Sequence, residues 1–164
     1  MEPVKQYFDA EKYESILFIA VGVGAALLAI YFLVANKQPF YKGMACPMLL
    51  VAAIQIVVGT TVLARTQQDI DRVQNQIANA KSEIDTQEIP RMKIVMRKFV
   101  VYRYVEIALL LLGIAVIIAA SPLSAAHGGG YGLAMQAAIM LLLDFFAERR
   151  GAEYLAFLSK MAAI

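Results

Sequence analysis

The hydrophobic positions of this chain fall into four long runs, separated by segments that carry most of the charge. A helix needs roughly 20 mostly apolar residues to cross the hydrocarbon of a bilayer. We therefore expect four transmembrane helices, at residues 15–35, 44–64, 100–120 and 131–147. The fourth is the shortest, and it follows the glycines 128–130, which are poor helix formers and are expected to belong to a loop.

The segment 65–99, between the second and third runs, is polar but keeps a narrow apolar stripe. Its apolar residues recur every three or four positions, which is the period of one face of a helix. We expect span two to continue as a helix, to turn within 81–89, and to return as a helix into span three. The two arms would form a hairpin and bury the contact stripe Ile70, Val73, Ile77, Ile84, Met92 and Met96.

The segment 148–164 is predicted to be an amphipathic helix, with Tyr154 and Leu158 on its apolar face. Such a helix lies in the membrane interface, or packs on the hairpin or on a partner. The expected fold is therefore all-α. It is a single membrane domain, 1–164, in which a polytopic four-helix transmembrane bundle carries a cytoplasmic helical hairpin that extends spans two and three.

Composition and charge support a membrane location and give an orientation. Of the 164 residues, 60% are hydrophobic and 17% are charged, against about 45–50% apolar residues in soluble domains. Four spans place both termini and 65–99 on the same side, and of the 15 lysines and arginines only Lys37 and Lys42 lie on the other. Because cytoplasmic loops carry the excess of lysine and arginine, we expect both termini in the cytoplasm.

Three ionisable residues, Arg103, Glu106 and Asp144, lie inside the predicted spans near their cytoplasmic ends. A charge in the hydrocarbon costs at least about 2.5 kcal/mol, so these residues need a partner or a role. One hypothesis is that Arg103 reaches toward water and pairs with Glu106 or Asp144, which would tie spans three and four together. A second is a proton or cation site made of the two carboxylates, and a third is a charged residue supplied by a partner.

Polar and small residues also occur deeper in the spans. Gln55 and Gln136 are expected either to form hydrogen bonds between helices or to line a pore. Small residues allow two helices to approach closely. One face of span one carries such residues, and it is either internal to the bundle or a contact between copies of the chain: Gly22, Ala25, Ala26 and Ala29.

No pattern in the sequence indicates catalysis, a metal or a cofactor. The only histidine, His127, has no second histidine or cysteine cluster with which to bind a metal. The single cysteine, Cys46, is expected to be a small buried residue of a helix. The net charge of +2 is small, and no basic tract carries the aromatic residues of a nucleic-acid reader. We expect no enzyme, no metal, no cofactor and no nucleic-acid partner.

In size and topology the chain is similar to small bacterial four-span inner-membrane proteins, including the immunity proteins that neutralise pore-forming toxins. That similarity implies a bacterial inner membrane. The hairpin with its amphipathic flanks, together with the lack of a catalytic set, predicts a non-enzymatic membrane protein that acts by binding another membrane or cytoplasmic protein, as an accessory subunit or an immunity-like protein. The alternative is a subunit of a homo-oligomeric ion or proton channel or transporter. The bilayer itself is a partner in both cases.

Overall fold

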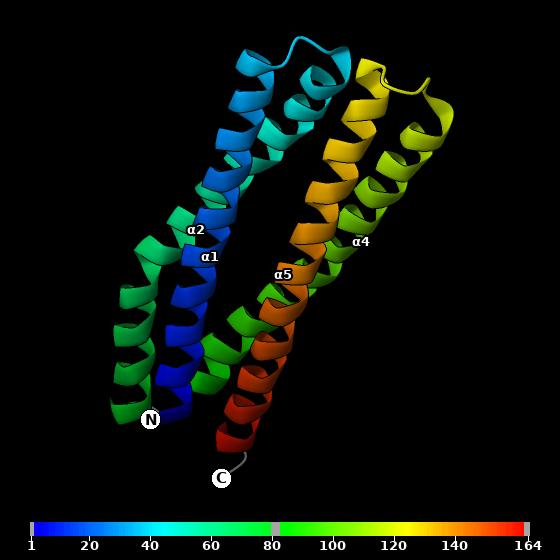
Figure 1. Cartoon of the computed structure of the whole chain (residues 1–164). Helices are drawn as coiled ribbons and strands as arrows, with labels where there is room; N and C mark the ends of the chain where they lie inside the picture. The colour runs from blue at the N-terminus through cyan, green and yellow to red at the C-terminus, as the bar shows by residue number, and fades with distance from the viewer. Residues whose placement is uncertain (1, 80–82, 163–164) are drawn as a thin grey trace.

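The chain folds into four long helices (Figure 1). The structure, a computed structural model, describes residues 2–79 and 83–162. No strand occurs in these two ranges, and all four helices are long and apolar enough to cross a membrane. The prediction of an all-α fold with four helices able to span a membrane is therefore confirmed. The elements are α1 (Glu2–Ala35), α2 (Pro39–Asn79), the π-helical turn η1 (Ile84–Glu88), α4 (Ile89–Ala119) and α5 (Ala125–Ala162).

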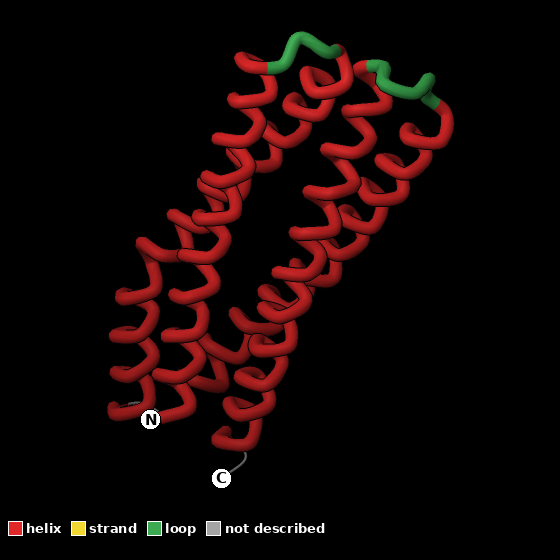
Figure 2. Tube along the Cα trace, viewed as in Figure 1, coloured by secondary structure: helices red, strands yellow, loops and turns green. Residues whose placement is uncertain are grey.

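Both termini lie at one end of the bundle, which we call the terminal end. Figure 2 shows the loops at 36–38 and 120–124 together at the opposite end, the loop end. The turn expected within 81–89 falls partly outside the described residues, which omit 80–82. The chain is helical from Glu83 to Ala119, and η1 lies at the terminal end.

The helices form two antiparallel pairs, α1 with α2 and α4 with α5 (Figure 1). Helices α2 and α5 make the main contact between the pairs, and α1 and α5 make a smaller one. In the most apolar stretch of α1, and in that of α4, only 11% of the residues are buried. Most side chains there therefore face outward, as lipid-facing residues do. Cys46, which we expected to be buried, is exposed.

Glycines hold the loop end together, because they let helix backbones touch. A Cβ atom added to Gly43 of α2 would lie 1.9 Å from the carbonyl oxygen of Ala125, and one added to Gly128 of α5 would lie 1.8 Å from that of Phe40. The expectation that glycines 128–130 form a loop is wrong, since α5 begins at Ala125 and includes them. Close packing between helices outweighs their poor intrinsic helix propensity.

A second glycine contact joins α4 to α5. A Cβ atom added to Gly113 would lie 2.9 Å from the carbonyl oxygen of Gly130, and one added to Gly130 would lie 2.9 Å from that of Gly113. The contact is reciprocal, so neither helix can slide along the other without a side chain meeting a backbone. It therefore fixes the register of this antiparallel pair.

The small-residue face of α1 is internal at two of its positions. A Cβ atom added to Gly22 would lie 3.1 Å from the carbonyl oxygen of Ala52 and from the Cβ of Gln55. Ala29 is fully buried in a cluster with Ala45 of α2. At these positions the face packs within the chain and not against a second copy.

At the terminal end, all four helices and η1 contribute to one hydrophobic core. Its buried residues are Val4, Tyr7, Phe8, Val73, Ile84, Ile89, Met92, Tyr154 and Leu158. Fully burying a large apolar side chain in water-exposed protein contributes roughly 1.5–3 kcal/mol. This core can therefore supply much of the stability that the thinly packed spans lack.

The contact stripe expected from the sequence lies in and around this core. Val73, Ile84 and Met92 are buried in it, and Ile70 and Ile77 pack against it. The remaining member, Met96, is half-buried, and its sulfur would lie 3.0 Å from a Cβ atom added to Gly151 of α5.

The C-terminal segment continues α5 without a break as far as Ala162. Its residues Tyr154 and Leu158 are buried in the terminal-end core, and Phe157 and Met161 pack against that core. The sequence left three places open for this segment: the membrane interface, the hairpin and a partner. In the structure the segment packs on the other helices of the same chain.

We predict that Gly128→Ala destabilises the bundle by about 1–3 kcal/mol, the usual cost of overpacking, because the new methyl group meets the Phe40 carbonyl. Thermal unfolding of the protein in detergent, followed by circular dichroism, measures the loss. The matched control is Gly24→Ala, where nothing lies within 4 Å of the added Cβ and stability should stay the same or rise. Equal stability of the two variants would contradict the close contact.

Candidate functional site

The most unusual polar residues of the spans meet between α4 and α5. Glu106 of α4 is only 3% exposed, and Asp144 of α5 is half-buried. Their carboxyl groups are neighbours, close enough to interact directly. Neither carboxylate oxygen of Glu106 accepts a hydrogen bond from any described residue. The structure thus brings together the two carboxylates that the sequence singled out.

Arg103, the third member of the predicted cluster, turns away from the two carboxylates and pairs with Glu148 of α5. The expected pairing of Arg103 with Glu106 or Asp144 is therefore not the one observed. The antiparallel register explains the difference, because Arg103 and Glu148 each lie about one helical turn nearer the terminal end than the two carboxylates. An arginine near the end of a span reaches toward water, and here it finds a carboxylate on the way.

A second ion pair lies at a similar level, between Arg150 of α5 and Glu14 of α1. Together with Arg103–Glu148 it forms what we call the ion-pair layer. Glu14 and Glu148 both act electrostatically on Asp144, so the layer borders the carboxylate pair on its terminal side. No ion pair among the described residues includes Glu106 or Asp144.

This arrangement limits what the pair can be chemically. Two carboxylates side by side in a low-dielectric environment repel each other, and no arginine or lysine of the described chain neutralises them. Such a pair is stable when it shares a proton or binds a cation. No group of three or more potential ligands for a metal ion occurs among the described residues, so a proton or a weakly held monovalent cation fits the pair better than a tightly held divalent metal.

The two glutamines of the spans are completely buried. Neither the amide nitrogen nor the amide oxygen of Gln55 or Gln136 has a hydrogen-bond partner among the described residues. They therefore do not form, with any described residue, the hydrogen bonds between helices that one hypothesis predicted. A buried polar group without a partner costs about 1–3 kcal/mol, so these amides favour water or another polar species inside the bundle.

One charged network was missed by the sequence analysis. Glu88 at the end of η1 is 1% exposed, and it forms ion pairs with Arg91 at 2.6 Å and Arg72 at 3.6 Å. The hydroxyl of Tyr154 donates a hydrogen bond to Glu88 at 3.3 Å. Burial, and then the negative charge of Glu88, raise the pKa of Tyr154 above its usual range. Tyr154 therefore stays a hydrogen-bond donor at physiological pH and joins η1 to α5.

The sequence offered a weak signal for this network. Glu88 and Arg91 are three residues apart at the start of a helix, where such side chains are neighbours. Nothing in their spacing shows that α5 would bring Tyr154 against them and bury the carboxylate.

No protein-family model, curated protein or solved structure matches this chain. Inferences about its function therefore rest on its own residues.

We predict that a double-mutant cycle of Arg103→Gln with Glu148→Gln gives a coupling energy of about 0.5–1 kcal/mol, the size expected for a partly exposed ion pair. The reason is that Arg103 pairs with Glu148 in the structure. The matched cycle of Arg103→Gln with Asp144→Asn should give less than about 0.3 kcal/mol, the level of residues that act independently. Unfolding in detergent measures both cycles. A larger coupling to Asp144 than to Glu148 would contradict the observed pairing.

Proposed function

We propose that this protein is a non-enzymatic integral membrane protein that binds a proton or a monovalent cation between Glu106 and Asp144. It serves as a subunit of a channel or transporter for that ion. The observation that carries the proposal is the pairing of Arg103 with Glu148, which leaves two neighbouring carboxylates inside the spans without a positive partner.

The surroundings of the pair fit an ion that enters and leaves. Gln136 lies on α5 eight residues before Asp144, about 12 Å nearer the loop end, and its amide has no partner among the described residues. Charged residues inside membranes commonly mark ion and proton pathways. With both termini in the cytoplasm, as the distribution of lysine and arginine favours, the ion-pair layer lies between the carboxylates and the cytoplasm. Four spans are few for a pathway within one chain, so the proposal includes a symmetric assembly.

We expect purified protein in liposomes to conduct protons or a monovalent cation, and Glu106→Gln and Asp144→Asn each to lower the flux at least tenfold by removing a carboxylate of the site. A pH-sensitive dye inside the vesicles reports proton flux under an imposed pH gradient and membrane potential, and sodium- and potassium-sensitive dyes report the cations. Asp71→Asn is the control, since it makes the same change at an exposed position of α2. Wild-type flux no higher than that of empty liposomes, for all three ions, would sink the proposal.

A second candidate function, binding of another protein, is favoured by the outer face of α4 at the terminal end. There Lys93, Arg97 and Lys98 are exposed and form no ion pair with a described residue. Ile94, beside them, is 55% exposed. The predicted contact stripe is packed inside the chain, so in this candidate function the partner binds outside it, on this basic face of the proposed cytoplasmic hairpin. An acidic amphipathic segment of a membrane or cytoplasmic protein has the complementary chemistry.

We predict that the triple variant Lys93→Gln, Arg97→Gln and Lys98→Gln lowers the affinity for such a partner at least tenfold, because its charges carry the attraction. A photo-crosslinking residue at position 94, used in native membranes, identifies the partner, and its purified form gives the affinity. The control changes three exposed lysines elsewhere at the terminal end, Lys5, Lys12 and Lys160, to glutamine. Crosslinks to lipid alone would show that this face touches the membrane surface and would reject the candidate.

A further inference from the structure

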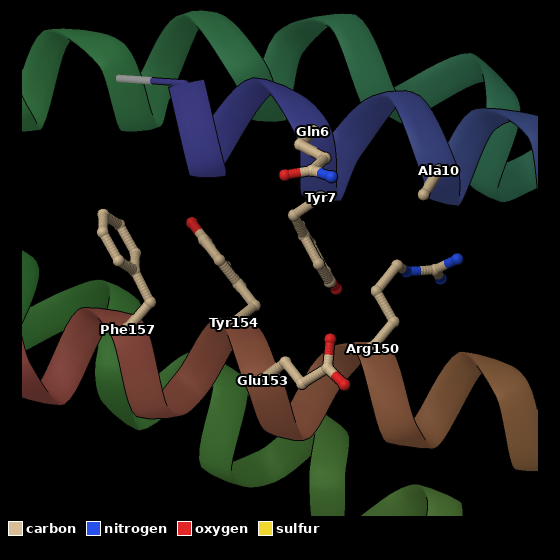
Figure 3. A pocket seen from close by; sticks show the side chains of 7 residues that line it. All are labelled: Gln6, Tyr7, Ala10, Arg150, Glu153, Tyr154 and Phe157. Carbon is tan, nitrogen blue, oxygen red and sulfur yellow. The ribbon is translucent and has the colours of Figure 1, made fainter.

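A pocket of about 240 Å³ lies between α1 and α5 at the terminal end (Figure 3). The four residues of α5 that line it are spaced by three, one and three positions along the sequence, so they share one face of the helix. The lining comprises Gln6, Tyr7 and Ala10 of α1, and Arg150, Glu153, Tyr154 and Phe157 of α5. The pocket therefore combines one cation, one carboxylate and three aromatic rings.

The aromatic wall is rigid. The rings of Tyr7 and Tyr154 stack with centroids 4.0 Å apart and an angle of 10° between their planes. Both hydroxyl groups are engaged away from the pocket, that of Tyr154 with Glu88 and that of Tyr7 with the sulfur of Met92. The two tyrosines are buried and stack on each other, so they offer a ligand only a small apolar surface, whereas the half-buried Phe157 offers more.

Arg150 supplies a positive group that is only partly satisfied. Its side chain is 17% exposed and its guanidinium carbon lies 5.4 Å from the ring centre of Tyr7. One terminal nitrogen is in the ion pair with Glu14, whereas the buried Nε donates to no described residue. A guanidinium stays charged in proteins and presents a planar edge that matches phosphate oxygens. Because Nε is buried, the exposed part of the guanidinium is what a phosphate group can reach, and Nε is an unused donor beside it.

Glu153 supplies the opposite charge one turn further along the same face of α5. Figure 3 shows the side chain of Arg150 extending from α5 toward α1 and the carboxylate of Glu153 lying close to α5. The carboxylate of Glu153 lies 3.4 Å from Arg149, but both side chains are at least 70% exposed, and such a pair contributes little. Glu153 can therefore exchange Arg149 for an ammonium group, which the neighbouring aromatic rings also attract.

The depth of the pocket favours a lipid. Arg150 is three residues beyond the end of the predicted span at 147, or about 4.5 Å along the helix. The headgroup layer on each side of the hydrocarbon is roughly 5–8 Å thick. Arg150 thus lies within the headgroup layer, and Glu153, about 9 Å beyond that end of the span, lies just outside it, where it can meet the charged end of a headgroup that projects toward water.

We propose that this pocket binds the zwitterionic headgroup of a phospholipid, with the phosphate at Arg150 and the ammonium between Glu153 and the aromatic rings. The ligand class is a phosphate joined by a two-carbon link to an ammonium. Free phosphoethanolamine carries the same chemistry, so the test includes both sources. This proposal rests on the pocket and not on the proposed ion transport.

The test measures binding of phosphatidylethanolamine and phosphatidylglycerol to the whole protein in detergent, by native mass spectrometry. We expect at least a tenfold preference for phosphatidylethanolamine. Arg150→Gln should weaken its binding at least tenfold, and Glu153→Gln should remove the preference between the two lipids. The matched control is Arg149→Gln, which makes the same charge change at the adjacent exposed residue and should bind at least as tightly as the wild type, because it removes only the side chain that the ammonium displaces from Glu153.

Ala10→Leu provides a second variant that changes no charge. It fills the pocket with a larger side chain, so it should also abolish lipid binding. If Arg150→Gln does not fold, this variant alone tests whether the lipid binds in the pocket. Displacement of the lipid by millimolar phosphoethanolamine would show that a free ligand is accepted, and lack of displacement would show that the lipid is the ligand. Equal retention of the two lipids by the wild type, or retention unchanged in both Arg150→Gln and Ala10→Leu, would overturn the proposal.

Discussion

The arrangement of polar groups in this protein depends on how closely α5 lies against its neighbours. At Gly128 it meets the backbone of α2, and at Gly130 it meets Gly113 of α4. Lipid tails are as apolar as the helices, so close packing, and not expulsion of water, decides how membrane helices associate. Glycine contacts of this kind are close in only one register. They therefore determine which side chains of α4 and α5 face each other.

That register accounts for the state of the ionisable residues. It places Arg103 opposite Glu148, near the ends of the spans, and it places Glu106 next to Asp144 one turn deeper. In a different register Arg103 would form an ion pair with one of the deeper carboxylates. That ion pair would only hold α4 and α5 together. In the observed register Arg103 pairs with Glu148. Glu106 and Asp144 are left without a positively charged partner, and a proton or a cation can take that place.

The sequence predicted the features that depend on single helices and missed those that depend on how helices meet. Four apolar runs were enough to predict an all-helical membrane protein, and Glu106 with Asp144 could be placed at one depth by counting residues. The partner of Arg103 could not be predicted, because it depends on a register fixed by Gly113 and Gly130. The helical state of glycines 128–130 was missed for a related reason. Intrinsic propensity argues for a loop there, whereas contact with another backbone decides the outcome.

The ion-pair layer connects the two proposed sites. Arg150 borders the pocket with its free Nε and holds Glu14 with a terminal nitrogen, and Glu14 in turn acts electrostatically on Asp144. A phosphate bound at Arg150 competes with Glu14 for the guanidinium charge. Glu14 then carries more uncompensated negative charge in the layer that borders the carboxylate pair. In the proposed scheme, a lipid bound at the terminal end therefore changes the charge beside the ion site through a single arginine.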